Sequence, residues 1–361
     1  MPHTLDPHAD LVTLLRQLVD IESVSGNEAE IADAVEAVLR SCEHLETTRF
    51  GHTLVARTML GRDQRVAIAG HLDTVPVANN LPSSLEEHPE GLRVVGRGSC
   101  DMKGGVAVAL KNAVTITEPV HDVTWLFYEC EEVNGERNGL HLLAQQHPEL
   151  LEADFAVLME PSRAGVEGGC QGSIRVRITT SGTAAHSARS WMGHNAIHDL
   201  GPVLDRLAEF KPREVEVEGL VYREGLNAVG IGGGIAGNVV PDAAHVDINY
   251  RFAPDRSLDE ALQILREHFS DWELEIEDAS PAARPGLTHP AAQDFLEAVG
   301  GEPGPKYGWT DTARFSAMGI PAVNYGPADA RVAHADHEFC PASDLEACDA
   351  GLRRWLTGEG R

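Results

Sequence analysis

Short apolar runs that end at histidine or acidic residues are the feature that most constrains how this chain can fold. The runs are residues 66–69, 123–128, 155–159 and 322–325. Nearly continuous apolar runs of this length are typical of strands that helices cover on both faces of a sheet. The helical pattern of residues 104–116, between the first two runs, supports this interpretation. The sequence therefore predicts an α/β fold.

The residues beyond these runs are of the kinds that bind divalent metal ions. They are His71, Asp73, Asp101, Glu131, Glu132, Glu160 and His334, of which Asp101 follows a glycine-rich turn. Ligands of open α/β sheets bind beyond the carboxyl ends of the strands, so we expect these side chains to meet there. Imidazole and carboxylate groups suit zinc, cobalt and manganese. Two histidines and at least four carboxylates exceed the needs of one zinc ion and indicate two ions bridged by a carboxylate, a site that hydrolyses amides.

Length and charge limit the class of protein. The 361 residues exceed the about 250 to 300 at which a single core stops growing, so two domains are expected. A formal charge of -27, from 56 acidic and 29 basic residues, argues against nucleic-acid or anionic membrane partners. No apolar stretch approaches the about 18 residues of a membrane span. The N-terminal residues lack a signal-peptide pattern and the six cysteines form no CxxC pair, so we expect a cytoplasmic protein.

The pattern changes near residue 171, which indicates an inserted α+β domain. Residues 174–178 and 246–250 alternate apolar and polar side chains, as strands with one buried face do. The predicted catalytic domain comprises residues 1–170 and 284–361, and the insertion residues 171–283. Serine followed three residues later by glutamate predicts helix capping boxes at Ser25–Glu28 and Ser257–Glu260.

Five motifs, in order along nearly the whole chain, resemble those of the zinc-dependent superfamily of aminoacylases, carboxypeptidase G and desuccinylases. They are His-x-Asp at 71–73, Gly-Arg-Gly-x-x-Asp-Met-Lys-Gly at 96–104, Glu-Glu at 131–132, Glu-Pro at 160–161, and a late histidine before an acidic residue at 334–336. The resemblance implies a zinc-peptidase-like catalytic domain with a mixed sheet covered by helices, and an inserted ferredoxin-like dimerisation and lid domain. A homodimer is implied as well.

The same resemblance implies a role for each candidate residue. One zinc ion would take His71, Asp101 and Glu160, and the other Asp101, Glu132 and His334, with cobalt as a possible substitute. Asp73 would bind no metal ion itself and would orient the His71 imidazole. Glu131 would be the general base that deprotonates a water shared by the two ions, and then protonates the departing amine. A cis peptide bond after Asp101 is also implied.

Further segments resemble the branch of succinyl-diaminopimelate desuccinylases. They are residues 169–173, 186–191 and 308–311. The implied reaction is hydrolysis of N-succinyl-LL-2,6-diaminopimelate to succinate and LL-2,6-diaminopimelate in lysine biosynthesis. His186 would stabilise the developing oxyanion in the partner's active site. The implied substrate contacts are Asn238, Arg251, Thr310 and Arg314, of which the arginines suit a substrate with several carboxylates.

Several positions depart from the superfamily's pattern. Cys170 and Gln171 stand where desuccinylases carry basic residues, so the sequence leaves the binding of the succinyl carboxylate unassigned. Cys130 replaces a common aspartate, and His337 is a second possible ligand beside His334. Alternative functions are acetylornithine deacetylase, N-acyl-amino-acid deacylase, dipeptidase, or a non-catalytic metal-binding or ligand-binding homologue. A non-catalytic homologue would have no use for Glu131, because a binding protein needs metal ligands but no general base.

Overall fold

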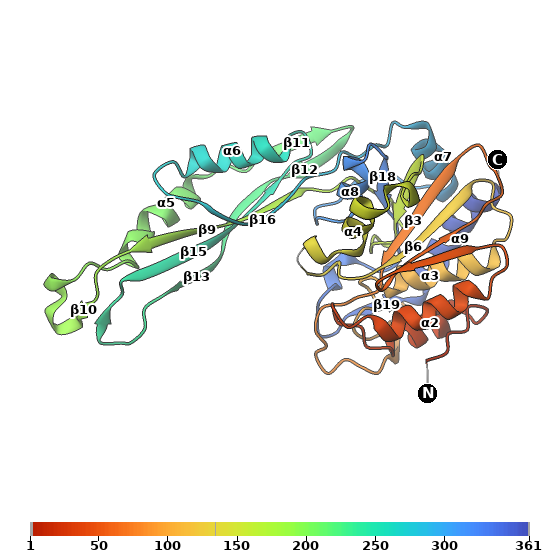
Figure 1. Ribbon diagram of the computed structural model, residues 1–361, viewed down its shortest axis with the longest axis horizontal. Helices are drawn as coiled ribbons and strands as arrows, with labels where there is room; N and C mark the ends of the chain where they lie inside the picture. The colour runs from red at the N-terminus through yellow and green to blue at the C-terminus, as the bar shows by residue number, and fades with distance from the viewer. Residues whose placement is uncertain (1–2, 134, 360–361) are drawn as a thin grey trace. The chain divides into compact units, whose positions relative to one another are not determined.

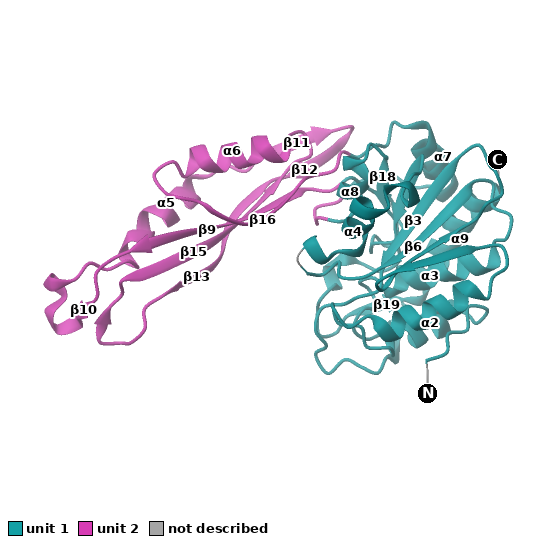
Figure 2. Cartoon of the chain, in the orientation of Figure 1, with its two compact units in different colours: residues 1–169, 285–304, 310–361 teal, residues 170–284, 305–309 magenta. Residues whose placement is uncertain are grey.

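A computed structural model of the chain describes residues 3–133 and 135–359, which divide into two units (Figure 2). Unit 1 comprises residues 1–169, 285–304 and 310–361, and unit 2 comprises residues 170–284 and 305–309. The short segment 305–309 is held in unit 2 by hydrogen bonds. The Trp309 indole donates to the Pro281 carbonyl at 3.0 Å, and the Tyr307 hydroxyl donates to the Val221 carbonyl at 3.3 Å.

Unit 1 is built on an eight-stranded mixed sheet with the order β1-β2-β6-β3-β7-β18-β8-β17 (Figure 1). Strand β3 pairs in parallel with β6 and β7, and β7 pairs in parallel with β18, whereas β1, β2 and β8 are antiparallel to their neighbours. The strands are β1 (Glu46–Phe50), β2 (Thr53–Arg57), β3 (Arg65–His71), β6 (Asp122–Tyr128), β7 (Phe155–Leu158), β8 (Glu167–Gly168), β17 (Gly304–Pro305) and β18 (Ala322–Asn324). The parallel strands lie at the centre, where the sequence has its continuous apolar runs.

Helices cover both faces of this sheet, as the sequence predicts. On one face Leu140 of α4 and Phe315 of α8 pack in a cluster with sheet residues such as Leu126. On the other face Phe155 contacts Phe295 of α7 and Trp355 of α9. The helices of unit 1 are α1 (Leu11–Val19), α2 (Ala29–Arg40), α3 (Lys103–Thr115), α4 (Gly139–Gln146), α7 (Pro290–Val299), α8 (Thr312–Ala317) and α9 (Ala342–Thr357), with short 3-10 turns at Gly135–Arg137, Pro148–Leu150 and Ala330–Val332. The predicted α/β catalytic fold is confirmed.

A second, three-stranded sheet in unit 1 has no counterpart in the sequence prediction. Its order is β19-β5-β4, with β4 at Ser84–His88, β5 at Gly91–Val95 and β19 at Phe339–Pro341. Phe339 pairs with Val95 in its register. The pairing places the chain just before β19 beside the turn that leads from β5 to Asp101. Strand β4 was missed because most of its residues are exposed, so it carries no alternation of buried and exposed positions.

Unit 2 has the chain order β9-α5-β13-β15-α6-β16 and a four-stranded antiparallel sheet in the order β13-β15-β9-β16. This is the split βαβ arrangement of ferredoxin-like folds, which confirms the predicted class of the insertion. The main elements are β9 (Gly172–Ser181), α5 (Gly201–Glu209), β13 (Gly225–Gly233), β15 (Ala243–Phe252), α6 (Leu258–His268) and β16 (Glu275–Ser280). Unit 2 also contains a hairpin of β11 (Glu214–Val217) and β12 (Leu220–Arg223), and a short antiparallel pair of β10 (Ala185–His186) and β14 (Val239–Val240), which are far apart in sequence. Short 3-10 turns lie at Ser187–Met192 and His198–Leu200.

One of the two predicted capping boxes is wrong. At α6 the Ser257 side chain and Glu260 cap each other's backbone amides, as predicted. At α2 the N-cap is Glu28 and no side chain caps the helix. The Ser25 hydroxyl instead donates to the Asp73 carboxylate at 2.7 Å. The Ser25 hydroxyl therefore bonds to the Asp73 carboxylate and does not cap the helix, since hydrogen bonds to charged acceptors are stronger.

The helices in the described part of the chain are too short or too polar to cross a membrane.

Candidate metal centre

Three neighbouring parallel strands deliver the candidate ligands to one edge of the sheet. Strand β3 ends at His71, which pairs with Tyr128 at the end of β6. Strand β7 ends at Leu158, which pairs with Ala69 of β3. The chain beyond β6 carries Glu131 and Glu132, and the chain beyond β7 carries Glu160. Since all three strands end at nearly the same level, these side chains come together, as the position of ligand sites in open α/β sheets predicts.

The Asp101 carboxylate lies between the two histidines. Its Oδ1 is 3.2 Å from Nε2 of the buried His71, and its Oδ2 is 3.4 Å from Nε2 of the half-exposed His334. His334 Nε2 is also 2.8 Å from Oε1 of Glu132. The peptide bond from Asp101 to Met102 is cis, as the resemblance implied. One carboxylate with an oxygen directed at each imidazole is the arrangement that a ligand shared by two metal ions requires.

Three overlapping groups of side chains could each hold a metal ion. Within each group the ligand atoms lie within 4.8 Å of one another. The groups are His71, Asp101 and Glu160; Asp101, Glu132 and His334; and His71, Glu131 and Glu132. Nitrogen and oxygen donors in sets of three fit zinc and similar divalent ions. The first two groups are those that the sequence resemblance implied.

A tight turn behind the centre is organised by the Asp73 carboxylate. Cys130 adopts a left-handed backbone conformation, with φ of 57°, which is uncommon outside glycine. The turn directs two successive amides toward Asp73, so that Glu131 N–H donates to Oδ1 at 3.0 Å and Glu132 N–H donates to Oδ2 at 3.1 Å. With the Ser25 hydroxyl, the Asp73 carboxylate accepts three hydrogen bonds. Asp73 therefore positions the Glu131–Glu132 pair as well as His71.

The orientation of His71 depends on the backbone more than the sequence implied. Its Nδ1 is 3.0 Å from the Asp73 carbonyl oxygen and 3.5 Å from the Asp73 carboxylate. The carbonyl oxygen accepts a hydrogen bond from Nδ1–H, and this leaves Nε2 to face Asp101. Both contacts come from one residue, so the His-x-Asp motif holds the imidazole within its own turn.

Charges at the centre shift the pKa values of its groups strongly. Hydrogen bonds with Asp101 and Glu132 raise the pKa of His334 to about 10. Burial lowers the pKa of His71, but hydrogen bonds with Asp101 and Asp73 outweigh it and raise that pKa well above its usual value. Burial also raises the pKa of Asp101, but hydrogen bonds from the two histidines outweigh it and hold that pKa well below its usual range.

Burial raises the pKa of Glu131 well above its usual value. The His71 imidazolium opposes this shift, and the nearby carboxylates, Glu160 first among them, add to it. A cluster of carboxylates that share so little positive charge attracts protons or cations. Metal ions would supply the missing charge and lower the pKa of Glu131 again.

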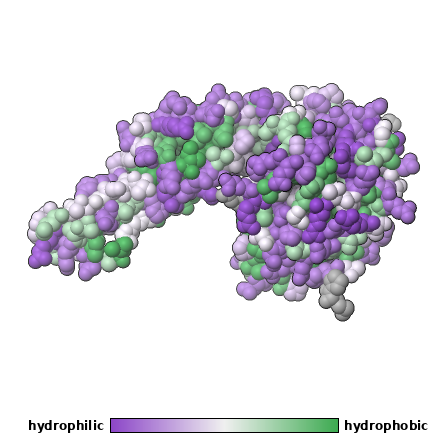
Figure 3. All heavy atoms as spheres, in the orientation of Figure 1, coloured by the Kyte–Doolittle hydropathy of each residue, from purple (hydrophilic) through white to green (hydrophobic). Residues whose placement is uncertain are grey.

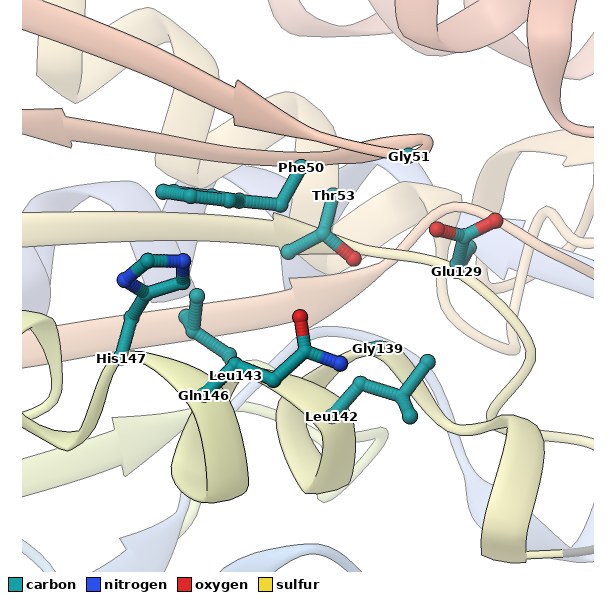
Figure 4. Close-up of a pocket in the computed structure, with 9 residues that line it drawn as sticks. All are labelled: Phe50, Gly51, Thr53, Glu129, Gly139, Leu142, Leu143, Gln146 and His147. Atoms are coloured by element: carbon teal, nitrogen blue, oxygen red, sulfur yellow. The ribbon is translucent and has the colours of Figure 1, made fainter.

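Glu129, the first acid of the same run, points away from the centre. Its carboxylate accepts the His52 N–H at 2.7 Å and faces a cavity of about 120 Å³ (Figure 4). Side chains of Phe50, Thr53 and His147 line the same cavity. The left-handed turn at Cys130 interrupts the alternation of side chains that β6 would continue, so the carboxylates of Glu129 and Glu131 have different surroundings. His337, the alternative to His334, is exposed and belongs to none of the ligand groups found among the described residues.

Two buried charged residues near the centre were missed by sequence reasoning. Glu338 accepts hydrogen bonds from the backbone amides of Cys100 and Asp101. Lys103 is buried, donates from Nζ to the Ile21 carbonyl at 2.7 Å, and has its pKa lowered by burial to about 7. Lys103 stands inside the Gly-Arg-Gly motif and Glu338 follows His334 at a short spacing. Those positions were the only available signal, because burial of a charge leaves no mark in a hydrophobic pattern.

The proposed substrate contacts of unit 1 already have partners within the protein. The Thr310 hydroxyl is buried and hydrogen-bonds to Thr312 and to the Asn324 side chain, both at 2.8 Å. Arg314 forms an ion pair with Asp311, and its Nη1 is 3.1 Å from His141 Nδ1. These contacts fix both side chains in place.

In unit 2 the structure separates the candidate residues into two places. Strands β10 and β14 pair His186 with Val239, directly after Asn238, and the Ser187 N–H donates to the Asn238 carbonyl at 2.9 Å. Strand β15 begins at Ala243, shortly after β14. Arg251 lies near the far end of β15, eight positions from Ala243, or roughly 26 Å along the strand. Its Nε donates to Asn249 at 3.1 Å. Within one chain, His186 and Arg251 cannot touch the same small substrate.

The residues that replace the usual basic pair are buried in unit 2. The Gln171 amide donates to the Arg223 carbonyl at 2.6 Å, and Cys170 forms an isolated bridge with Ala283. Gln171 therefore has a structural partner and does not stand as a free amide for a carboxylate.

Comparison with known proteins agrees with this fold and site. Residues 67–357 match the peptidase family M20/M25/M40. The putative succinyl-diaminopimelate desuccinylase DapE of Mycobacterium tuberculosis is 52% identical, over 98% of this chain and 100% of its own. The succinyl-diaminopimelate desuccinylase of Corynebacterium glutamicum is 44% identical, over 98% of both chains. Among solved structures, a tripeptidase from Staphylococcus aureus superposes with a TM-score of 0.79 at 19% identity and covers 98% of both chains.

The fold and the His–carboxylate centre define a metal-dependent amide hydrolase. The chain belongs to peptidase family M20/M25/M40. The M20 family metallo-carboxypeptidase Sso-CP2 of Sulfolobus solfataricus shares the fold, with a TM-score of 0.77 at 17% identity over 97% of this chain and 99% of its own.

Proposed function

We propose that this enzyme hydrolyses N-succinyl-LL-2,6-diaminopimelate to succinate and LL-2,6-diaminopimelate, a step of lysine biosynthesis. Support comes from the two desuccinylase relatives, which match nearly the full chain at 52% and 44% identity. The observation that carries the chemistry is Asp101, with one carboxylate oxygen directed at each of two histidines. The six cysteines, all within the described residues, form no disulfide bonds, which agrees with a reducing cytoplasm.

Two divalent ions, zinc or cobalt, would be held by the two ligand groups that share Asp101. The first ion would take His71 and Glu160, and the second Glu132 and His334. When bound, such ions polarise the amide carbonyl and make the attacking water more acidic. Asp73 contributes indirectly, because its carboxylate holds the amides of Glu131 and Glu132 in place.

Glu131 is the residue we assign as general base. It adjoins Glu132 and faces the same centre, since its carboxylate forms a group with His71 and Glu132 whose ligand atoms lie within 4.8 Å of one another. It would take the proton of the attacking water and pass it to the amine nitrogen as the amide C–N bond breaks. The products are then a free succinate carboxylate and the amine of diaminopimelate.

A homodimer accounts for the position of His186. Since His186 lies far along the sheet from Arg251, we propose that His186 acts in the partner's active site, where it stabilises the oxyanion. The proposed substrate contacts are Arg251 in unit 2 with Thr310 and Arg314 in unit 1, and Asn238, which lies beside His186 and would therefore contact the partner's substrate. Strand β13 is an edge strand, and its Val229 and Ile231 side chains are each 60% exposed. An edge that exposes apolar side chains suits pairing with a second copy.

The surface supports a self-association site in unit 2 over one in unit 1. Figure 3 shows mostly hydrophilic residues on the visible face of unit 1, and more apolar residues around the end of unit 2 that carries β10. The large apolar side chains that are most exposed in the described chain include Trp191, Met192 and Ile235, all of them in unit 2.

Zinc affinity of the chelator-stripped enzyme is expected to rise with pH. The pKa of His334 is about 10 in the folded protein, so the imidazole is protonated at neutral pH, and zinc must displace that proton to bind. One displaced proton makes the affinity about tenfold stronger for each pH unit, up to about pH 10. Competition titrations with a chromophoric chelator between about pH 6.5 and 8.5 measure this slope. In His334→Ala the slope for one ion should disappear, and an affinity independent of pH in the parent would contradict the assignment.

Turnover of two substrates tests the proposed function. We expect kcat/KM for N-succinyl-LL-diaminopimelate to exceed that for N-acetylornithine by at least about a hundredfold, which corresponds to about 2.7 kcal/mol of transition-state discrimination. Zinc-loaded and chelator-stripped protein are compared, so that metal dependence is measured in the same experiment. Metal-dependent turnover of N-acetylornithine alone would contradict the substrate and keep the mechanism. Loss of both would favour a non-catalytic homologue.

A further inference from the structure

A buried glutamate outside the ligand groups holds the backbone of Asp101. Glu338 is 1% exposed, and its Oε1 accepts the amide hydrogens of Cys100 and Asp101, each at 3.0 Å. The amide of Gly98 also donates to this carboxylate. In the same segment the Gly96 N–H donates to the Glu338 carbonyl oxygen at 3.0 Å, which extends the pairing of β19 with β5. One side chain therefore organises the whole turn that presents the Asp101 carboxylate.

The second oxygen of Glu338 binds an arginine that reaches the other ligand-bearing loops. Arg97 is 3% exposed, and its Nη1 donates to Glu338 Oε2 at 2.8 Å and to the Ala335 carbonyl at 3.2 Å. Its Nε donates to the Pro76 carbonyl at 3.0 Å. Ala335 is next to His334, and Pro76 lies in the loop after β3, three residues beyond Asp73. The planar guanidinium, with donors in a fixed fork, thus joins three loops that are far apart in sequence.

We propose that Arg97 and Glu338 are positioning residues that form the two-ion centre before any metal binds. The pair sets the Asp101 turn against the His334 turn, so that the two oxygens of Asp101 face the two imidazoles in the metal-free protein. This inference rests on the proposed function, because it takes Asp101 and His334 as ligands. Neither Arg97 nor Glu338 touches the substrate or an ion in this role.

The charges of the pair explain why both members are needed. A carboxylate and a guanidinium buried this deeply are tolerated only when each has full hydrogen-bond partners, and here the backbone of the ligand loops supplies those partners. Removing one partner leaves the other charge unpaired beside Asp101. The loops are then expected to separate or rotate, and the preformed spacing of the ligand atoms is lost. Groups that orient metal ligands typically change metal affinity by about 10- to 100-fold when mutated.

The experiment compares Glu338→Gln with Glu224→Gln, a matched change in unit 2. Glu224 is likewise buried, accepts a backbone amide from Ala253 at 3.2 Å, and pairs with Arg213 through two contacts of 2.8 and 3.0 Å. Both substitutions keep one acceptor oxygen and replace the other with an amide that faces an arginine. Both should lower Tm, but only the change at Glu338 should affect metal binding.

Zinc dissociation constants are measured on chelator-stripped protein by competition with a chromophoric chelator, together with Tm and turnover at increasing zinc. For Glu338→Gln we expect affinity to fall by about 10- to 100-fold and turnover to recover when zinc is raised, since the ligands themselves remain. For Glu224→Gln we expect the zinc affinity to stay within about twofold of the parent. Arg97→Lys keeps the charge and loses the fork, so it should give a smaller loss of zinc affinity than Glu338→Gln, and it serves as the second variant if Glu338→Gln does not fold.

Unchanged zinc affinity in folded Glu338→Gln and Arg97→Lys proteins would overturn the positioning role, whatever the stability loss. An equal loss of affinity in Glu224→Gln would overturn it too, since that loss would reflect general destabilisation. The zinc titrations use no substrate, so their result is independent of which acyl amino acid the enzyme cleaves. A parent protein that binds no zinc would overturn the metal assignment itself, and this role with it.

Discussion

Replacement of Glu131 by glutamine is expected to lower kcat by about 10²- to 10⁴-fold, the range that a positioned general base contributes. Zinc binding should remain close to that of the parent, because the two ligand groups that share Asp101 do not include Glu131. The glutamine keeps the size of the side chain and cannot accept a proton. The loss should therefore appear in kcat, with a small change in KM.

Glu129→Gln is the matched control for this experiment. Glu129 lies two residues earlier on the same chain segment, and its carboxylate faces the small cavity beside β6 and not the centre (Figure 4). Its substitution changes the charge by the same amount and should leave kcat within about twofold of the parent. Single-turnover and steady-state kinetics on zinc-loaded protein, with bound zinc measured in each sample, provide the readout.

Two outcomes would contradict the role of Glu131. Turnover that survives in metal-loaded Glu131→Gln would remove it as the base. Loss of one zinc ion in that variant would instead identify Glu131 as a ligand, in the alternative group with His71 and Glu132. Because Glu131 also lies within reach of His71 and Glu132, the amount of bound zinc shows whether Glu131 acts as a general base or as a metal ligand.

Replacement of Asp101 by alanine is expected to weaken both metal sites and to abolish measurable turnover. Asp101 belongs to both proposed ligand groups, and its two oxygens face the two histidines. Removal of one partner of a buried ionic interaction typically costs about 3 to 5 kcal/mol, or about 10²- to 10⁴-fold in affinity for each ion. Zinc titration of chelator-stripped protein, read as the number of ions bound and their affinities, measures the effect.

Single-site variants distinguish a bridging ligand from an ordinary one. Glu160→Gln should weaken one ion, and His334→Ala should weaken the other, since each residue belongs to one of the two groups. If Asp101→Ala lost a single ion and kept the second at parental affinity, Asp101 would not be the bridge. The folded state of each variant is checked by Tm in the presence of a chelator, where no metal contributes to stability.

Much of this centre could be predicted from local sequence, because its ligands follow directly after buried strands. His71 follows the apolar run 66–69, and Glu160 follows the run 155–159, so the ends of buried strands mark where ligands emerge. The resemblance of the motifs to those of the zinc-dependent superfamily implied the bridging role of Asp101 before any distance was known. The failed capping box at Ser25 shows the limit of local reasoning, because Asp73, 48 residues away, accepts the serine hydroxyl.

The sequence by itself determined the α/β class, the inserted α+β domain and the identity of the candidate ligands, because burial of strands and the chemistry of side chains are local properties. Only the tertiary structure decided which groups support the centre. Arg97 and Glu338 are 241 residues apart, and their ion pair depends on the pairing of β5 with β19, which no periodicity indicates. The energy of a buried charge comes from the partners that the fold brings to it, so its role follows from the assembled structure and not from its neighbours in the chain.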